Sequence, residues 1–263
     1  MRICRVAVDD ELFFGLIEGL DDELRITDGT LIALLEGHPF GELVPEGRLI
    51  RGVDARLVAP ILPSKVIAVG RNYADHAREL GNEVPTTPMI FLKPSTSVIG
   101  PGEPIPLPWQ SEQVDHEAEL AVVIGRMCRD VPVERVPEVI LGYTCANDVT
   151  ARDLQKSDGQ WGRAKGFDGF CPLGPWIVTD LEPDALAIEC TVNGETRQSG
   201  TTGEMVFDVP ELVSWISSVM TLLPGDVIVT GTPAGIGPVH AGDVVSVTIE
   251  GIGTLPNPVV DRE

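Results

Sequence analysis

The chain has 263 residues, enough for one large domain or for one domain with a small appendage. Its 40 acidic residues against 19 Lys and Arg give a formal net charge of −21, which argues against nucleic acid and anionic membranes as partners because both attract basic proteins. Five scattered cysteines without a CxxC pair indicate reduced thiols in a cytoplasmic protein, and no apolar run reaches the roughly 18 residues of a membrane span.

The first sixty residues are predicted to form a separate small unit. Two apolar runs joined by Asp9-Asp10-Glu11 are typical of a β-hairpin. Pro60 and Pro63 then interrupt the apolar pattern. We therefore place a linker near 57–63 and divide the chain into a small N-terminal domain, 1–60, and a main domain, 61–263.

The rest of the chain is predicted to be rich in strands. Apolar runs of strand length lie at 66–69, 119–124, 177–179, 186–192, 227–230 and 244–249. Asn193-Gly194 is a strong hairpin signal. One clear helix is expected from about 209 to 222, after a capping-box pattern of Asp208 and Glu211. Shorter helices are expected at 73–80 and 133–140, so the fold class is mixed, β-rich α+β.

His76 and Glu79 follow the first buried strand of the main domain. If this segment is helical, residues three apart share one face. A carboxylate that contacts an imidazole fixes its tautomer and raises its basicity, which makes a general-base pair. A surface helix with a mixed-charge face is the alternative.

Two lysines, Lys93 and Lys165, lie in apolar segments bounded by Gly or Pro. A lysine in such a place either extends its ammonium to solvent or meets an anion. Both alternatives stay open at this point.

Glu117 and Glu119 stand two residues apart at the start of an apolar run, so on a strand both carboxylates point to one face. Like charges held that close need a cation or a proton between them. With Asp148 they offer three hard oxygen ligands, which suit Mg²⁺ or Mn²⁺. The alternative is the solvated face of an edge strand.

A glycine-rich loop at 230–237 follows the strand at 227–230. Its exposed N–H groups and the Thr232 hydroxyl are suited to holding a carboxylate or a phosphate. It is not a Walker A loop, because no Gly-Lys-Ser/Thr follows. A structural turn is the alternative.

Taken in order, five segments resemble the fumarylacetoacetate hydrolase family over residues 60–260. They are Val69 to His76, Phe91 to Pro94, the Glu117-x-Glu119 pair, Asn147 to Asp153 and Thr230 to Pro233. The resemblance is closest to the acylpyruvate hydrolases, the oxaloacetate decarboxylases and the bacterial 2-hydroxyhepta-2,4-diene-1,7-dioate isomerases. It implies a β-sandwich roll with a small N-terminal domain, usually as a homodimer.

The resemblance also implies roles for individual residues. The expected ligands of Mg²⁺ or Mn²⁺ are Glu117, Glu119 and Asp148. The expected catalytic residues are His76, Glu79 and Lys165, the first two on a lid segment. The expected substrate-binding residues are Arg71, Gln155 and Thr232. Lys93 matches a lysine close to the site, and we assign no role to Asp115 or His116.

The implied substrate is a small 2-oxo acid or dicarboxylate. The metal polarises its carboxylate and keto oxygens and stabilises the enolate that forms when a C–C bond breaks. His76, oriented by Glu79, activates water for attack on an acylpyruvate, while Lys165 offsets developing charge. Oxaloacetate decarboxylation, isomerisation of a hydroxyheptadienedioate in aromatic catabolism and non-catalytic dicarboxylate binding are the alternatives.

Overall fold

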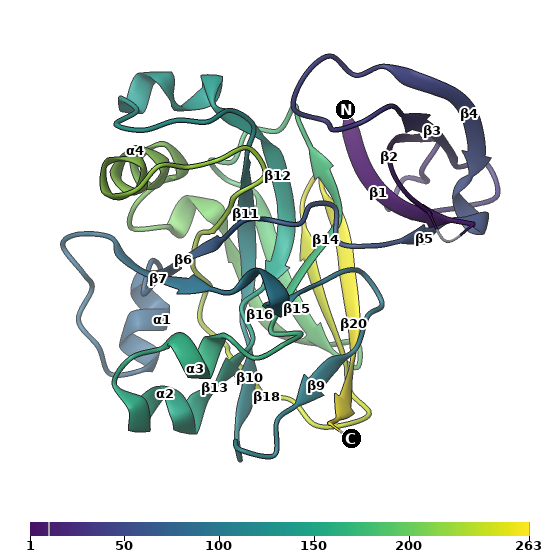
Figure 1. The fold of residues 1–263 in the computed structure, drawn as a ribbon. Helices are drawn as coiled ribbons and strands as arrows, with labels where there is room; N and C mark the ends of the chain where they lie inside the picture. The colour runs from purple at the N-terminus through teal and green to yellow at the C-terminus, as the bar shows by residue number, and fades with distance from the viewer. Residues whose placement is uncertain (10, 263) are drawn as a thin grey trace.

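A long mixed sheet runs through the computed structural model, which describes residues 1–9 and 11–262 (Figure 1). The strands follow the order β4 (Pro45–Arg51), β3 (Leu31–Leu35), β2 (Glu11–Glu18), β1 (Arg2–Val8), β14 (Cys171–Val178), β12 (Ile140–Asn147), β11 (Ala118–Ile124), β17 (Val227–Val229), β6 (Val66–Gly70) and β7 (Met89–Lys93). Two short strands lie off this path: β5 (Arg56–Leu57) pairs with β1, and β8 (Val98–Ile99) with β14. β17–β6 and β14–β8 are parallel, so the sheet is mixed.

Two smaller sheets complete the strands. One has five strands in the order β16 (Glu195–Thr201), β15 (Ala187–Val192), β19 (Val244–Ile249), β20 (Gly253–Asp261) and β9 (Ile105–Leu107). It packs against β11, β12 and β14, and β15 and β19 alternate buried with less buried residues, as strands with one core face do. The other joins β13 (Thr150–Ala151), β10 (Val114–His116) and β18 (Gly237–Pro238). The predicted β-rich α+β class is confirmed.

The helices are short. They are α1 (Ala74–Glu79), α2 (Arg152–Asp158), α3 (Gly162–Lys165) and α4 (Val209–Val219), with 3₁₀ turns η1 (Gly52–Asp54), η2 (Ser95–Ser97), η3 (Val133–Glu138) and η4 (Thr202–Glu204). The capping box of α4 is present, but the helix ends at Val219 because Met220 is extended. The helix predicted at 133–140 is the 3₁₀ turn η3, which contains Pro137, a residue without the N–H that an α-helix needs. No helix within the described residues is long and apolar enough to cross a bilayer.

The two predicted hairpins form. β1 and β2 pair antiparallel, although their connecting turn includes Asp10, which lies outside the described residues. Asn193 and Gly194 join β15 to β16 with φ of +53° and +81°, as a two-residue turn with positive φ at both positions requires.

The N-terminal strands are continuous with the main sheet. β1 pairs with β14 through Arg2↔Val178 and Ile3↔Ile177, and the Ile3 side chain belongs to the same core as Ile61. The division at residue 60 therefore stays a prediction.

Candidate functional site

Four segments that are distant in sequence meet where central strands of the main sheet begin or end. β11 is antiparallel to both β12 and β17, and β17 is parallel to β6. The ends of β6, β12 and β17 therefore lie beside the start of β11. These positions carry Arg71, Asp148, the glycine-rich loop and the Glu117/Glu119 pair.

Glu117, Glu119 and Asp148 form one carboxylate cluster. One oxygen from each lies within 4.8 Å of the others. Glu117 falls between β10 and β11, and Glu119 is the second residue of β11. Glu117, Glu119 and Asp148 are 4%, 1% and 2% exposed, respectively, so the alternative of a solvated edge strand is wrong.

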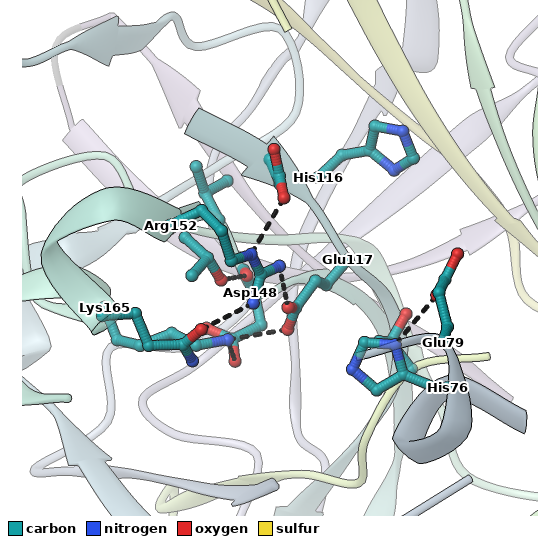
Figure 2. A network of polar contacts seen from close by, with 12 residues as sticks. His76, Glu79, His116, Glu117, Asp148, Arg152 and Lys165 are labelled. Carbon is teal, nitrogen blue, oxygen red and sulfur yellow. Dashed lines mark hydrogen bonds and ion pairs between the residues drawn. The ribbon is translucent and has the colours of Figure 1, made fainter. Parts of the chain in front are cut away.

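Three buried cations surround the cluster. Lys165 Nζ donates to Glu117 Oε2 at 2.7 Å and to Asp148 Oδ2 at 2.5 Å. Arg152 Nη2 donates to Glu117 Oε1 at 2.6 Å, and its Nε donates to Asp115 Oδ2 at 2.9 Å. Lys93 Nζ pairs with the other oxygen of Asp148. Both lysines thus meet anions rather than solvent, as Figure 2 shows for Lys165.

The two glutamates experience opposite electrostatic environments. Burial acts to raise the pKa of Glu117, but Lys165 and Arg152 outweigh it and hold that pKa well below its usual range. Burial, with the Asp148 and Glu117 carboxylates, raises the pKa of Glu119 well above its usual value. Among the described residues, Glu119 accepts one hydrogen bond, from Gly231 N at 2.7 Å, and forms no ion pair.

The cluster fits a divalent cation. Together with Asp115, the cluster sets four buried carboxylates against three buried cations, and Glu119 is the one of the four that forms no ion pair within the described residues. Three carboxylate oxygens without sulfur or nitrogen suit a hard metal such as Mg²⁺ or Mn²⁺. Such a cation would supply the positive charge that Glu119 lacks.

His76 stands opposite the cluster on α1 and is 5% exposed (Figure 2). Its Nδ1 lies 3.4 Å from Glu79 Oε2. Glu79 in turn accepts from Gly235 N, at 3.1 Å to Oε1. The sequence prediction that the histidine and glutamate share one helix face is confirmed, and the alternative of a purely surface helix is wrong for His76.

A cavity of about 250 Å³ joins these groups. Its lining residues include His76, the three cluster carboxylates, Lys165, Arg71, Gln155 and Thr232. Eight of the nine predicted site residues thus line one cavity, and Glu79 contacts it through His76.

The three predicted substrate-side residues lie at different places in this cavity. Gln155 Oε1 accepts from Arg152 Nη1 at 2.8 Å, so its amide NH₂ group is the end left for a ligand. Arg71 has φ of +59°, rare for a residue with a side chain, and its guanidinium lies 6.0 Å from the centre of the Trp161 ring. The Thr232 hydroxyl donates to Ala118 O at 2.8 Å.

The sequence did not predict several contacts that the site residues make. Arg152 lies within the motif that carries Asp148, but the sequence gives no sign that it reaches Glu117. Trp161 forms a cavity wall with Phe91, at 5.2 Å between ring centroids. Asp115 and His116, left without a role, bond to Arg152 and Gln198.

Comparisons with known proteins show which families the chain resembles. A family profile described as "Fumarylacetoacetate (FAA) hydrolase C-terminal" matches residues 65–260, and one described as "Rv2993c-like, N-terminal" matches residues 1–60. The solved 2-hydroxyhepta-2,4-diene-1,7-dioate isomerase of Mycobacterium marinum is 52% identical, with a TM-score of 0.92 over 100% of this chain and 99% of that one.

Two further relatives carry other activities in their names. The mitochondrial oxaloacetate decarboxylase of Dictyostelium discoideum is 46% identical over 197 residues, 72% of this chain and 90% of that protein. A maleylpyruvate hydrolase of Sphingobium, solved with manganese(II) and pyruvate, is 31% identical with a TM-score of 0.80 over 100% of both chains. The whole-chain superpositions confirm the predicted fold.

Proposed function

The chain belongs to the fumarylacetoacetate hydrolase family of enzymes, and we propose that it hydrolyses a C–C bond in small acylpyruvate-type 2-oxo acids with the help of Mg²⁺ or Mn²⁺. One observation carries the proposal: the His76–Glu79 pair and the buried carboxylate cluster line or adjoin the same cavity of about 250 Å³. Hydrolysis needs both a base for water and a site for a polarising cation.

The proposed ligands are Glu117, Glu119 and Asp148. When bound there, a divalent cation supplies Lewis acidity toward the carboxylate and keto oxygens of a 2-oxo acid. Arg152 and Lys93 hold Glu117 and Asp148 in place, as hydrogen bonds to ligating carboxylates commonly do.

The remaining steps fall to the chain's own side chains. His76, oriented by Glu79, removes a proton from water, which attacks the C4 carbonyl. The C3–C4 bond then breaks, and the proton held by His76 is available to C3 of the departing three-carbon fragment. Lys165 also lines the cavity, and its ammonium is proposed to offset the negative charge that develops on that fragment. Arg71, Gln155 and Thr232 are proposed to bind the substrate.

Oxaloacetate decarboxylation is the second candidate, favoured by the name of the Dictyostelium relative. It uses the same cation site and Lys165 but needs no water attack. A 1,3-proton shift, as the name of the M. marinum neighbour implies, would use His76 as the base and leave the substrate mass unchanged.

The first experiment measures pyruvate release from acetylpyruvate and from oxaloacetate with Mn²⁺, with EDTA as a control. We expect faster, metal-dependent release from acetylpyruvate. Faster release from oxaloacetate would replace hydrolysis by decarboxylation. Release from neither substrate would contradict both and leave isomerisation to be tested by the change in ultraviolet absorbance of a hydroxyheptadienedioate substrate.

His76→Ala separates the candidates further. We expect it to abolish acetylpyruvate cleavage, because the water loses its base, while Mn²⁺ and oxalate still bind. Arg78→Ala is the matched control, since Arg78 lies on the same helix but is exposed and pairs with Asp75. Unchanged cleavage in His76→Ala would remove His76 from the mechanism.

We further propose a cytoplasmic homodimer. All five cysteines are free, and burial raises the pKa of the Cys4, Cys171 and Cys190 thiols to about 12, as expected of unreactive structural thiols in a reducing compartment. The proposed homodimer is tested separately, by light scattering after size exclusion, which measures the oligomeric state directly.

A further inference from the structure

Gln198 is a buried glutamine on β16 whose side chain joins two parts of the site. Its residue exposure is 0%. Oε1 accepts from Ala118 N at 2.9 Å and lies 3.1 Å from His116 Nδ1. Nε2 donates to Thr232 Oγ1 at 2.7 Å and to Pro233 O at 2.8 Å. Because Ala118 N can only donate and Pro233 O can only accept, these partners fix the orientation of the amide.

The oxygen and the nitrogen of this amide are hydrogen-bonded to two different segments of the chain. Ala118 lies between the proposed ligands Glu117 and Glu119. Thr232 and Pro233 belong to the glycine-rich loop 230–237. Gln198 therefore links the strand of the carboxylate cluster to that loop and is not one of the residues that line the cavity.

The loop supplies main-chain donors to both halves of the site. Gly231 N donates to Glu119 Oε2 at 2.7 Å. Four residues later, Gly235 N donates to Glu79 Oε1 at 3.1 Å. A shift of the loop would therefore disturb a proposed ligand and the residue that orients His76 together.

Close packing leaves the loop little freedom against β16. A Cβ added to Gly235 would lie 2.2 Å from Arg197 O, and one added to Gly200 would lie 2.9 Å from the Pro233 side chain. The loop thus rests directly on the strand that carries Gln198. At this contact the two donors of Gln198 are bonded to Thr232 and Pro233.

We propose that Gln198 is a positioning residue that sets loop 230–237 so that Gly231 meets Glu119 and Gly235 meets Glu79. Its effect on turnover rests on the proposed function. Its effect on Mn²⁺ affinity rests on the metal site of that proposal, whereas its effect on the loop amides does not, because hydrogen exchange is measured without substrate or metal.

The test substitution is Gln198→Glu, which keeps the shape but removes both donors and places a carboxylate oxygen against Pro233 O. The matched control is Asn257→Asp. Asn257 is also a buried amide, 1% exposed, and donates to Gly100 O and Glu103 O, both at 2.8 Å, away from the residues that line the cavity.

For Gln198→Glu we expect kcat and Mn²⁺ affinity each to fall by about 10- to 100-fold, the range typical of residues that position metal ligands. Hydrogen exchange at Gly231 and Gly235 should accelerate. Asn257→Asp should lower Tm comparably but change kcat and Mn²⁺ affinity by no more than about twofold, because it is remote from the site. Mn²⁺ affinity is read from the electron paramagnetic resonance signal of free Mn²⁺.

The proposal is overturned if Gln198→Glu leaves Mn²⁺ affinity and both exchange rates unchanged. It is also overturned if the losses of kcat and Mn²⁺ affinity in the two variants are proportional to their losses in Tm. If Gln198→Glu yields no folded protein, Gln198→Met, which removes the donors without adding charge, takes its place. Failure of the wild-type protein to cleave any 2-oxo acid would contradict the proposed function alone, since the exchange rates still test Gln198.

Discussion

Glu119 differs from its two neighbours in having no cationic partner among the described residues. Glu117 and Asp148 each meet a lysine ammonium, whereas Glu119 accepts only the Gly231 N–H. Its burial beside two other carboxylates is unfavourable for the charged form. This burial does not stabilise the metal-free fold, and a cation at the proposed site would offset it.

This placement predicts the behaviour of Glu119→Gln. Without metal, the variant should be as stable as the wild type or more stable, because the amide relieves carboxylate repulsion. At Mn²⁺ near 100 times Kd, binding should raise the wild-type Tm by about 5–10 °C. We expect this rise to disappear in Glu119→Gln, as measured by calorimetry.

Glu138→Gln is the control for Glu119→Gln, since Glu138 is exposed and pairs with Arg135 at the surface. It should keep the full Mn²⁺-induced rise in Tm. A normal rise in Glu119→Gln would exclude this residue as a ligand.

For individual residues, the sequence was sufficient to predict contacts between side chains that lie close together along the chain. Glu117 and Glu119 are two residues apart at the start of β11, and His76 and Glu79 are three apart on one helical turn, so their spacing alone brings them together. Arg152 and Gln198 could not be assigned in this way. The carboxylates that Arg152 contacts and the partners of Gln198 lie 34 to 82 residues away, and which polar side chain reaches a given group depends on tertiary packing.

The short helix α3 carries Lys165 into the cavity, and its geometry is tightly restricted at one end. A Cβ on Gly166 would lie 2.4 Å from the Gly162 carbonyl oxygen, whereas one on Gly162 meets nothing within 4 Å. The two glycines of this helix region therefore differ sharply in what they tolerate.

We accordingly expect Gly166→Ala to displace α3 and with it Lys165. Its kcat should fall by about tenfold or more, because small displacements of catalytic groups are costly. Gly162→Ala is the matched control and should retain wild-type kcat. Steady-state kinetics of both variants decides the matter, and equal activity in the two would show that α3 adjusts without moving the lysine.

Helices were predicted correctly from the sequence where a capping pattern marks their start. The prediction was wrong where a proline within the segment prevents an α-helix. The capping box of Asp208 and Glu211 correctly located the start of α4. The segment 133–140 has a helical apolar pattern, but Pro137 restricts it to a 3₁₀ turn. The meeting of β6, β11, β12 and β17 at one edge depends on strand order, which no local pattern specifies.

For the whole molecule, the junction between the N-terminal strands and the main sheet is the feature that sequence reasoning did not reach. The separate family match of residues 1–60 and the prolines near 60 suggest two units. The structure joins them by the β1–β14 pairing, between strands some 170 residues apart. Ile3 is fully buried at this junction, in one core cluster with Ile61, Val66 and Ile177.

Whether the two parts unfold together is tested by Ile3→Ala. Removing a buried isoleucine side chain costs about 2–5 kcal/mol, which corresponds to a Tm lower by roughly 5–15 °C. Because β1 is hydrogen-bonded to β14, we expect one cooperative calorimetric transition that moves as a whole. Leu49→Ala on β4 is the control, since Leu49 is 61% exposed and its loss should change stability by no more than about 0.5 kcal/mol. Two separate transitions, only one of which responds to Ile3→Ala, would instead show that 1–60 and 61–263 are independent domains.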